Sequence, residues 1–147
     1  MTLVKLVLIA TLIGLLSSCS HQLPVKSGWQ TLFNGKNLDG WIAKIHHHNV
    51  GENVADTFRV ENGLLRVSYD QYHTFDKQFG HLYFNQPFSN FHLKLDYHFY
   101  GDFMSDAPHY AKRNSGVMYY SQAPETILKE QDWPISVEMQ FLAGLED

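Results

Sequence analysis

The sequence predicts an all-β domain built as a sandwich or jelly roll. Short runs rich in aromatic and β-branched residues alternate between apolar and polar positions, as strands with one buried face do. Asn, Gly and Pro turn signals separate these runs, and only one short segment is typical of a helix. Many short antiparallel strands joined by tight turns are typical of sandwiches and jelly rolls.

The first expected strands form a hairpin. Residues 58–60 and 64–69 are rich in strand-forming residues and flank the Glu-Asn-Gly sequence at 61–63, in which Asn-Gly favours a tight antiparallel turn. The next expected strand covers residues 81–84 and ends at the proline-containing turn at 85–87.

The clearest expected strand runs from Phe91 to Phe99. Alternate positions are apolar over its whole length, so one face would be buried and the other would meet water. The apolar face carries Phe91, Leu93, Leu95, Tyr97 and Phe99. The polar face carries His92, Lys94, Asp96 and His98.

Three further elements complete the expected domain. A strand at 117–120 follows the Asn-Ser-Gly turn at 114–116, and the last strand covers residues 137–142. Between them, residues 124–131 are expected to form one short helix, because Pro124 is tolerated in the first helical turn.

The N-terminus has the pattern of a bacterial lipoprotein signal. A basic start with Lys5 precedes an apolar run at 6–16, which is shorter than the about 20 residues that a membrane span needs. The Leu-Ser-Ser-Cys sequence at 16–19 resembles the bacterial lipobox, whose cysteine is diacylated and becomes the mature N-terminus. Cys19 is therefore the expected lipidation site. The alternative is an ordinary signal peptide with an incidental cysteine.

These features divide the chain into three parts. Residues 1–18 are the expected signal peptide, 19–27 a polar tether and 28–147 the folded domain. Ser20 follows the cysteine at the position where Asp favours inner-membrane retention in the lipobox pattern. The expected location is therefore the outer membrane of the cell envelope, with the domain facing the periplasm or the cell exterior.

Composition excludes some classes of partner. Lys5 is the only charged residue of 1–18, so the remainder carries ten Lys and Arg against fifteen Asp and Glu, a net charge of −5. This balance argues against nucleic acid, because phosphate binding requires basic side chains. Cys19 is the only cysteine, so no internal disulfide can form and stability must come from a hydrophobic core. The aromatic residues either fill this core or form platforms for sugar rings.

Five segments resemble the 3-keto-disaccharide hydrolase domain family, a jelly roll related in architecture to concanavalin-like lectins and glucanases. In chain order they are GWQTLFNGKNLDGW at 28–41, FRVENGLL at 58–65, FSNFHLKLDY at 88–97, NSGV at 114–117 and VEMQ at 137–140. The resemblance implies a hydrolase that acts on the glycosidic bonds of 3-keto-disaccharides or related glycosides. Family members usually continue past the last segment. The expected domain is therefore an incomplete sandwich, either truncated or completed by a partner chain.

Glu138 is the first candidate for a catalytic residue. Glu138 and Gln140 are two positions apart, so they share one face of the last expected strand. The resemblance implies that an in-facing carboxylate on a central strand is the usual catalytic element of such jelly rolls. The alternative is a glutamate that faces solvent on a half-exposed strand.

The reaction implied by the resemblance requires a base and hydrogen-bond donors. A ketone at C3 of a sugar acidifies the hydrogen at C2, so a base can remove it and the C1 group can depart before water adds. A carboxylate with a raised pKa or a histidine suits the base. The candidate catalytic residues are Glu138 and His109, since the resemblance implies that the loop carrying His109 helps to frame the cleft. The candidate substrate-binding residues are Gln140, Asn114 and Arg113.

Nine histidines leave a metal ion open as a cofactor. In a strand, adjacent residues of the triplet at 46–48 would point to opposite faces, so only His46 and His48 could bind one ion. A second set of this kind consists of His92, Asp96 and His98. The alternative is exposed histidine without a metal. No residue is therefore assigned as a metal ligand, and a divalent ion stays an open cofactor.

Three functions remain open from the sequence. They are an envelope-anchored hydrolase of 3-keto-glycosides, a non-catalytic carbohydrate-binding module and an inactive truncated fragment. The substitution Glu138→Gln separates the first two, because it would abolish turnover but barely change the affinity of a lectin. The sequence contains no Gly-x-Ser-x-Gly elbow, phosphate loop or dinucleotide fingerprint. It specifies no protein partner.

Overall fold

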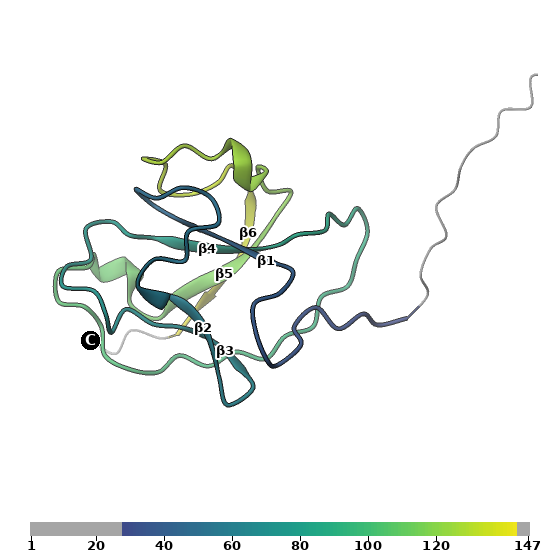
Figure 1. The fold of residues 1–147 in the computed structure, drawn as a ribbon, viewed down its shortest axis with the longest axis horizontal. Coiled ribbons are helices and arrows are strands. Elements are labelled where there is room, and N and C mark those ends of the chain that lie inside the picture. Colours follow the sequence, from purple (N-terminus) through teal and green to yellow (C-terminus); the bar gives the residue numbers. More distant parts are fainter. Residues whose placement is uncertain (1–27, 144–147) are drawn as a thin grey trace, which may run out of the picture. The chain divides into compact units, whose positions relative to one another are not determined.

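The computed structural model describes residues 28–143, of which residues 31–143 belong to one structural unit (Figure 1). The expected signal peptide at 1–18, the lipidation site Cys19 and the tether at 19–27 lie outside the described residues. Within the part of the chain that the structure describes, no helix is long and apolar enough to cross a membrane.

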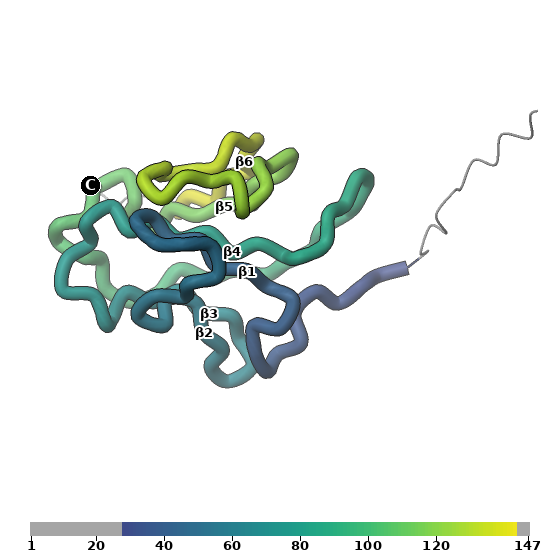
Figure 2. The backbone as a smooth tube through the Cα atoms, turned by 45° about the horizontal axis from the view of Figure 1, so that its top comes forward, coloured from purple at the N-terminus to yellow at the C-terminus, as the bar shows by residue number. Residues whose placement is uncertain are grey.

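The strands of the described residues pair as three separate two-stranded antiparallel sheets. The pairs are β1 (Trp41–Ile45) with β4 (Gly80–Phe84), β2 (Phe58–Glu61) with β3 (Leu64–Val67), and β5 (Asn114–Tyr119) with β6 (Val137–Leu142). In Figure 2 the β1–β4 pair lies between the other two pairs. The expected all-β class is confirmed and is consistent with a β-sandwich, whereas the jelly-roll topology stays a prediction.

The β2–β3 hairpin forms as its turn sequence predicts. Asn62 and Gly63 both adopt positive φ, at 52° and 78°, which is the requirement of the tight type I′ turn. The register places Arg59 opposite Arg66, an unfavourable pair of like charges. Glu61 offsets this repulsion, because its carboxylate contacts Arg59 Nε at 3.0 Å and also pairs with Arg66.

Connections in the described region contain short 3-10 helices. These are η1 (Val54–Asp56), η2 (His109–Ala111) and η3 (Pro124–Thr126). The helix expected over 124–131 is therefore wrong beyond its first turn. Gln131 Oε1 accepts a hydrogen bond from the Leu128 N–H at 3.2 Å, and Gln122 Nε2 donates to the Thr126 carbonyl at 2.8 Å. These side-chain bonds satisfy backbone groups that a longer helix would pair internally.

A small core forms where β1 and β4 meet β2. Its buried apolar residues are Ala43, Ile45 and Phe58, against which Leu38, Val54 and Leu82 pack. Ile45 lies opposite Gly80 in the β1–β4 register. A Cβ atom on Gly80 would lie 2.9 Å from Phe58 Cζ, so the glycine makes room for the Phe58 ring.

Strand β1 was not identified from the sequence. Its residues do not alternate, because Lys44 stands between the buried Ala43 and Ile45 and is itself buried. The Lys44 Nζ donates to the Ile45 carbonyl at 3.0 Å, which satisfies part of its hydrogen-bonding capacity. Burial lowers the pKa of Lys44, and the nearby Glu130 carboxylate partly opposes this shift.

Residues 91–99 do not form the strand that their alternation predicts. Within the described residues, no backbone–backbone hydrogen bond involves this segment. Its apolar face nevertheless lies against the β5–β6 pair, where the Tyr97 ring stacks on Phe141 with centroids 4.3 Å apart. Alternation indicates which side chains share a face, whereas a strand also needs a neighbour that accepts its backbone hydrogen bonds.

Candidate functional site

The β5–β6 pair brings three of the candidate site residues together. Its register places Glu138 opposite Met118 and Gln140 opposite Gly116, so paired residues project from the same face. Gln140 Nε2 donates to Asn114 Oδ1 at 3.0 Å. The expected common face of Glu138 and Gln140 therefore exists, and Asn114 joins it from the neighbouring strand.

Gly116 leaves the space that the Glu138 side chain occupies. A Cβ atom at position 116 would lie 2.3 Å from Glu138 Oε1 and 2.8 Å from its Cγ, far inside van der Waals contact. The carboxylate thus lies across the glycine, on the face of the strand pair that also carries Gln140 and Asn114. The turn expected at 114–116 is wrong, because these residues pair with β6 as the first part of β5. Gly116 therefore determines where the candidate base can sit from within the strand.

The two remaining candidates lie just before β5. His109 begins η2 and is exposed, and Arg113 is exposed with a positive φ of 49°. Asn114 Nδ2 donates to the carbonyl of Tyr110 at 2.7 Å, which ties η2 to the start of β5. Within the described residues, no hydrogen bond or ion pair joins the side chains of His109 or Arg113 to Glu138.

A hollow of about 650 Å³ lies beside η2 and the loop before β4. Its lining includes the aromatic residues Phe75, Phe79 and Tyr110. It also includes the acidic residues Asp76, Asp106 and Asp132. Aromatic faces together with a few carboxylates suit a carbohydrate, and the volume falls in the range of small-molecule sites. No sequence pattern predicted that these residues would meet, because they lie in connecting segments without periodic patterning.

A smaller hollow of about 240 Å³ lies on the opposite face of the β5–β6 pair from Glu138. Val117, Met139 and Phe141 line one side of it, and Leu93, Leu95 and Tyr97 line the other. Glu138 lines neither hollow. This apolar hollow therefore marks the place where the 91–99 segment packs against the β5–β6 pair.

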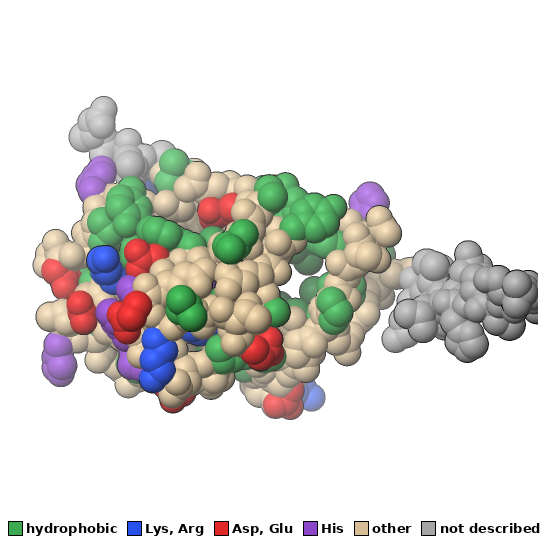
Figure 3. Space-filling view, turned by 90° about the horizontal axis from the view of Figure 1, so that it is seen from above, with side chains coloured by type: hydrophobic (Ala, Val, Ile, Leu, Met, Phe, Trp, Pro, Cys, Tyr) green, Lys and Arg blue, Asp and Glu red, His purple; other side chains and the backbone are tan. Residues whose placement is uncertain are grey.

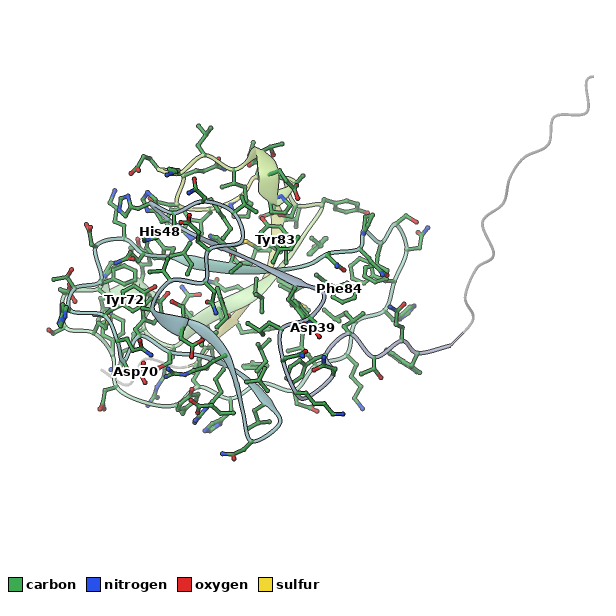
Figure 4. All side chains as sticks on the ribbon, viewed as in Figure 1. Asp39, His48, Asp70, Tyr72, Tyr83 and Phe84 are labelled. Carbon is green, nitrogen blue, oxygen red and sulfur yellow. The ribbon has the colours of Figure 1, made fainter. Side chains whose placement is uncertain are left out.

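The histidine triplet is arranged differently from its expected form. Residues 46–48 lie in the turn after β1, and His47 has a positive φ of 69°. The rings of His46 and His47 therefore stack, with centroids 4.0 Å apart, and both reach Glu130. His48, labelled in Figure 4, instead has its Nε2 atom 3.1 Å from Gln78 Oε1. His46 and His48 do not share a strand face, because the triplet lies in the turn after β1 and not in a strand.

The second set of residues considered for a metal ion does not come together among the described residues. His92, Asp96 and His98 lie on the exposed segment 91–99. Among the described residues, the histidine, cysteine and acidic side chains that meet closely enough for an ion are His46, His47 and Glu130. The turn after β1, rather than a strand face, provides the candidate ligands.

Comparison with known families decides the membership of this chain. Residues 28–147 match the family model described as a 3-keto-alpha-glucoside-1,2-lyase-like domain. The chain belongs to this family. The match confirms the resemblance carried by the five sequence segments and supports action on glycosides at the level of the family. No curated protein and no solved structure gives a match.

The stability of this lyase-like domain is expected to decrease below about pH 6.5, where an unfolded histidine gains its proton. Burial lowers the pKa of His81, and the nearby positive charge of Lys44 lowers it further. The hydrogen bond from His81 Nε2 to the Asp132 carbonyl raises the pKa and so partly opposes this shift. The unfolded chain therefore takes up this proton at a higher pH than the folded chain does. Urea unfolding at pH 7.5 and pH 5.5 measures the loss.

The variant His81→Gln retains a hydrogen-bond donor but does not titrate, so it should lose less unfolding free energy between the two pH values. The exposed His98→Gln is the matched control and should behave as the wild type does. Equal losses in the wild type and His81→Gln would contradict the assignment to His81.

Proposed function

We propose that this lyase-like domain cleaves the glycosidic bond of 3-keto-glycosides by elimination followed by addition of water. The family match supports the substrate class. The single structural observation behind the proposal is the Glu138 carboxylate, held across Gly116 beside the Gln140–Asn114 pair on adjacent strands. A base next to amide groups is what enolate formation on a hydroxylated ring requires.

Each residue has a defined role in the proposed reaction. Glu138 takes the proton from C2, and the electron pair moves to the C3 oxygen as an enolate. The C1–O bond then breaks, and the departing oxygen takes up a proton. Water adds its hydroxyl to C1 and a proton to C2, which restores the ketone. His109 is the second candidate for the base.

The amides of the site keep capacity for substrate hydroxyls. One N–H of Gln140 is used by Asn114 and one N–H of Asn114 by the Tyr110 carbonyl. Each side chain therefore retains one further N–H, and the Gln140 oxygen remains available as an acceptor. We assign to the Arg113 guanidinium the stabilisation of the enolate charge, because arginine stays protonated throughout.

The test compares a 3-keto-disaccharide with the same disaccharide before oxidation, in D2O, using the purified full chain. The proposal expects cleavage of the keto sugar alone and one deuterium at C2 of the released 3-keto sugar. Cleavage without deuterium at C2 would point to direct displacement at C1. Absence of cleavage would contradict the proposal.

The substitution Gly116→Ala is expected to lower kcat by about 10²-fold, the typical cost of an ångström-scale misplacement of a reacting group. The new methyl group would occupy the position of the Glu138 side chain, which must leave its present orientation. Steady-state kinetics and thermal unfolding measure activity and folding separately. Ser115→Ala, on the opposite face of β5, is the matched control, and equal kcat values for both variants would refute the positioning role.

A carbohydrate-binding function without catalysis is the second candidate. The aromatic and acidic hollow of about 650 Å³ favours it, because Glu138 does not line that hollow. Isothermal titration with the unoxidised and keto sugars would measure affinity. Binding without turnover, unchanged by Glu138→Gln, would support this function in place of the hydrolase.

We further propose that lipid on Cys19 anchors the domain to the outer membrane of the cell envelope. The lipobox-like residues at 16–19 support this location. Membrane fractionation of cells that express the wild type and Cys19→Ser tests it. The wild type should sediment with outer membranes, and recovery of both proteins in the same fraction would contradict the proposal.

A further inference from the structure

We propose that His46, His47 and Glu130 form a binding site for a divalent transition-metal ion such as Zn²⁺. One donor atom from each residue lies within 4.8 Å of the others. The inference concerns ion binding itself, so it does not depend on the proposed cleavage reaction. Figure 3 shows histidine, acidic and basic side chains close together on one part of the surface.

His46 presents a buried ring nitrogen to this site. Its side chain is only 3% exposed, and Nδ1 lies 2.9 Å from the carbonyl oxygen of Lys77. A carbonyl can only accept, so Nδ1 carries the proton and Nε2 keeps its lone pair. Among residues 28–143, no group forms a hydrogen bond with the buried Nε2 atom, which lies 3.6 Å from Glu130 Oε2. A metal ion would satisfy this nitrogen, which otherwise carries a desolvation cost.

His47 has a hydrogen-bond partner at each ring nitrogen. Its Nε2 donates to the carbonyl oxygen of Asp76 at 3.1 Å, so in the neutral ring Nδ1 carries the lone pair that a metal ion needs. This Nδ1 faces Glu130 Oε2 at 2.7 Å. Two electron-pair donors at that separation repel unless a proton or a metal ion lies between them. The backbone carbonyls thus orient both imidazoles toward one point, as the outer hydrogen bonds of metal-bound histidines do.

The spacing of the donor atoms is close to that of a tetrahedral site. Metal–ligand distances near 2.1 Å separate neighbouring ligand atoms by about 3.4 Å. The His46–Glu130 separation of 3.6 Å matches this value, and the His47–Glu130 separation of 2.7 Å is shorter. Glu130 has 70% of its side chain exposed, so it can withdraw by the about 0.7 Å required for the tetrahedral separation.

The donor set selects the class of ion. Two imidazole nitrogens and one carboxylate oxygen suit Zn²⁺, Co²⁺ or Ni²⁺, whereas Mg²⁺ and Ca²⁺ prefer oxygen alone. Three protein ligands leave the fourth position for water or another molecule, as in catalytic zinc sites. Asp132 Oδ1, 2.9 Å from His46 Nδ1, adds negative charge beside the site. The positive charge of the buried Lys44 would offset this negative charge. Burial lowers the pKa of Lys44, however, and so favours its neutral form.

The site adjoins the larger hollow. Asp76 and Asp132 line that hollow, and they also contact His47 and His46 respectively. An ion held by the histidines would therefore lie at the margin of the space that suits a sugar. Its open coordination position could receive an oxygen of a molecule bound there.

Metal binding is tested on the full chain, stripped with chelator and titrated with Zn²⁺ against a chromophoric chelator. The expected result is one Zn²⁺ per chain. Glu130→Gln and His47→Gln should weaken binding by at least the roughly 100-fold that loss of an outer-shell partner can cost. Both changes lie at exposed or half-exposed positions, so the variants should fold even if a change at the buried His46 does not.

The controls are His48→Gln, from the same turn, and His92→Gln, from the exposed segment. Both should bind Zn²⁺ as the wild type does. Co²⁺ substitution supplies a second readout, since four-coordinate Co²⁺ absorbs visible light strongly and six-coordinate Co²⁺ does not. The absence of stoichiometric binding, or equal affinity in the wild type, Glu130→Gln and His47→Gln, would overturn the inference.

Discussion

Replacing Glu138 with glutamine is expected to lower kcat for 3-keto-glycoside cleavage by about 10²–10⁴-fold, the usual contribution of a general base. Glutamine retains the size of the side chain and can still lie across Gly116, but it cannot accept the C2 proton. KM should change little, because the amides of Gln140 and Asn114 remain in place. Steady-state kinetics on a 3-keto-disaccharide measures both constants.

The matched control is Glu125→Gln, at an exposed glutamate of η3, which should leave kcat unchanged. The exchange of hydrogen for deuterium at C2 gives a second readout and should slow together with kcat. If Glu138→Gln retains full activity and His109→Gln loses it, the base is His109. If neither change matters, the proposed site on the β5–β6 face is wrong.

Truncating Ile45 to alanine is expected to lower the free energy of unfolding by about 2–5 kcal/mol, the range for removing a large aliphatic side chain from a core. Ile45 is completely buried and packs with Ala43 and Phe58 at the centre of the core. Few other buried apolar residues of the described region can compensate. Because domains are stable by only about 5–15 kcal/mol, the variant should be close to unfolding.

Denaturant unfolding followed by circular dichroism measures this change. Ile45→Val should cost only about 0.5–1.5 kcal/mol, because it removes a single methylene group. Leu128→Ala is the surface control, since Leu128 is 70% exposed, and its effect should stay within about 0.5 kcal/mol. Equal effects of Ile45→Ala and Leu128→Ala would show that the β1–β4 core does not hold the domain together.

The sequence predicted the features that depend only on residues close together along the chain. The Asn62-Gly63 turn determines the β2–β3 hairpin through its own backbone preferences, and the two-residue spacing of Glu138 and Gln140 places them on one face. Neither feature depends on distant parts of the chain. The hairpin and the common face were therefore predictable from residue types and spacing.

Elements that depend on distant neighbours were not predictable. Residues 91–99 carry the strongest alternation, yet no described segment pairs with their backbone. β1 becomes a strand because β4 lies beside it, although the buried Lys44 breaks its apolar pattern. In both cases pairing, rather than propensity, decides the structure.

The geometry of the candidate ion site was likewise not predictable from the sequence, because it depends on side chains that meet only in the folded chain. The triplet at 46–48 was visible in the sequence, but its geometry depends on a turn with positive φ at His47. Its acidic partner, Glu130, lies more than 80 positions further along the chain and belongs to no motif. The loops around the larger hollow likewise contain no sequence motif that predicts a site, because their residues meet only in the folded chain.

The division into three strand pairs has a consequence for how the domain fluctuates. Within the described residues, no backbone hydrogen bond links a strand of one pair to a strand of another. Each pair can therefore open without breaking the ladder of its neighbours, at a cost set by side-chain contacts and by a few backbone bonds between connecting segments, such as that from the His47 N–H to the Lys129 carbonyl. The β5–β6 pair, which carries Glu138, has a mostly exposed surface on β6 and little buried apolar contact to hold it closed. The β5–β6 pair with the proposed catalytic face can therefore open locally while the core around Ile45 stays folded. Only global unfolding would disrupt that core.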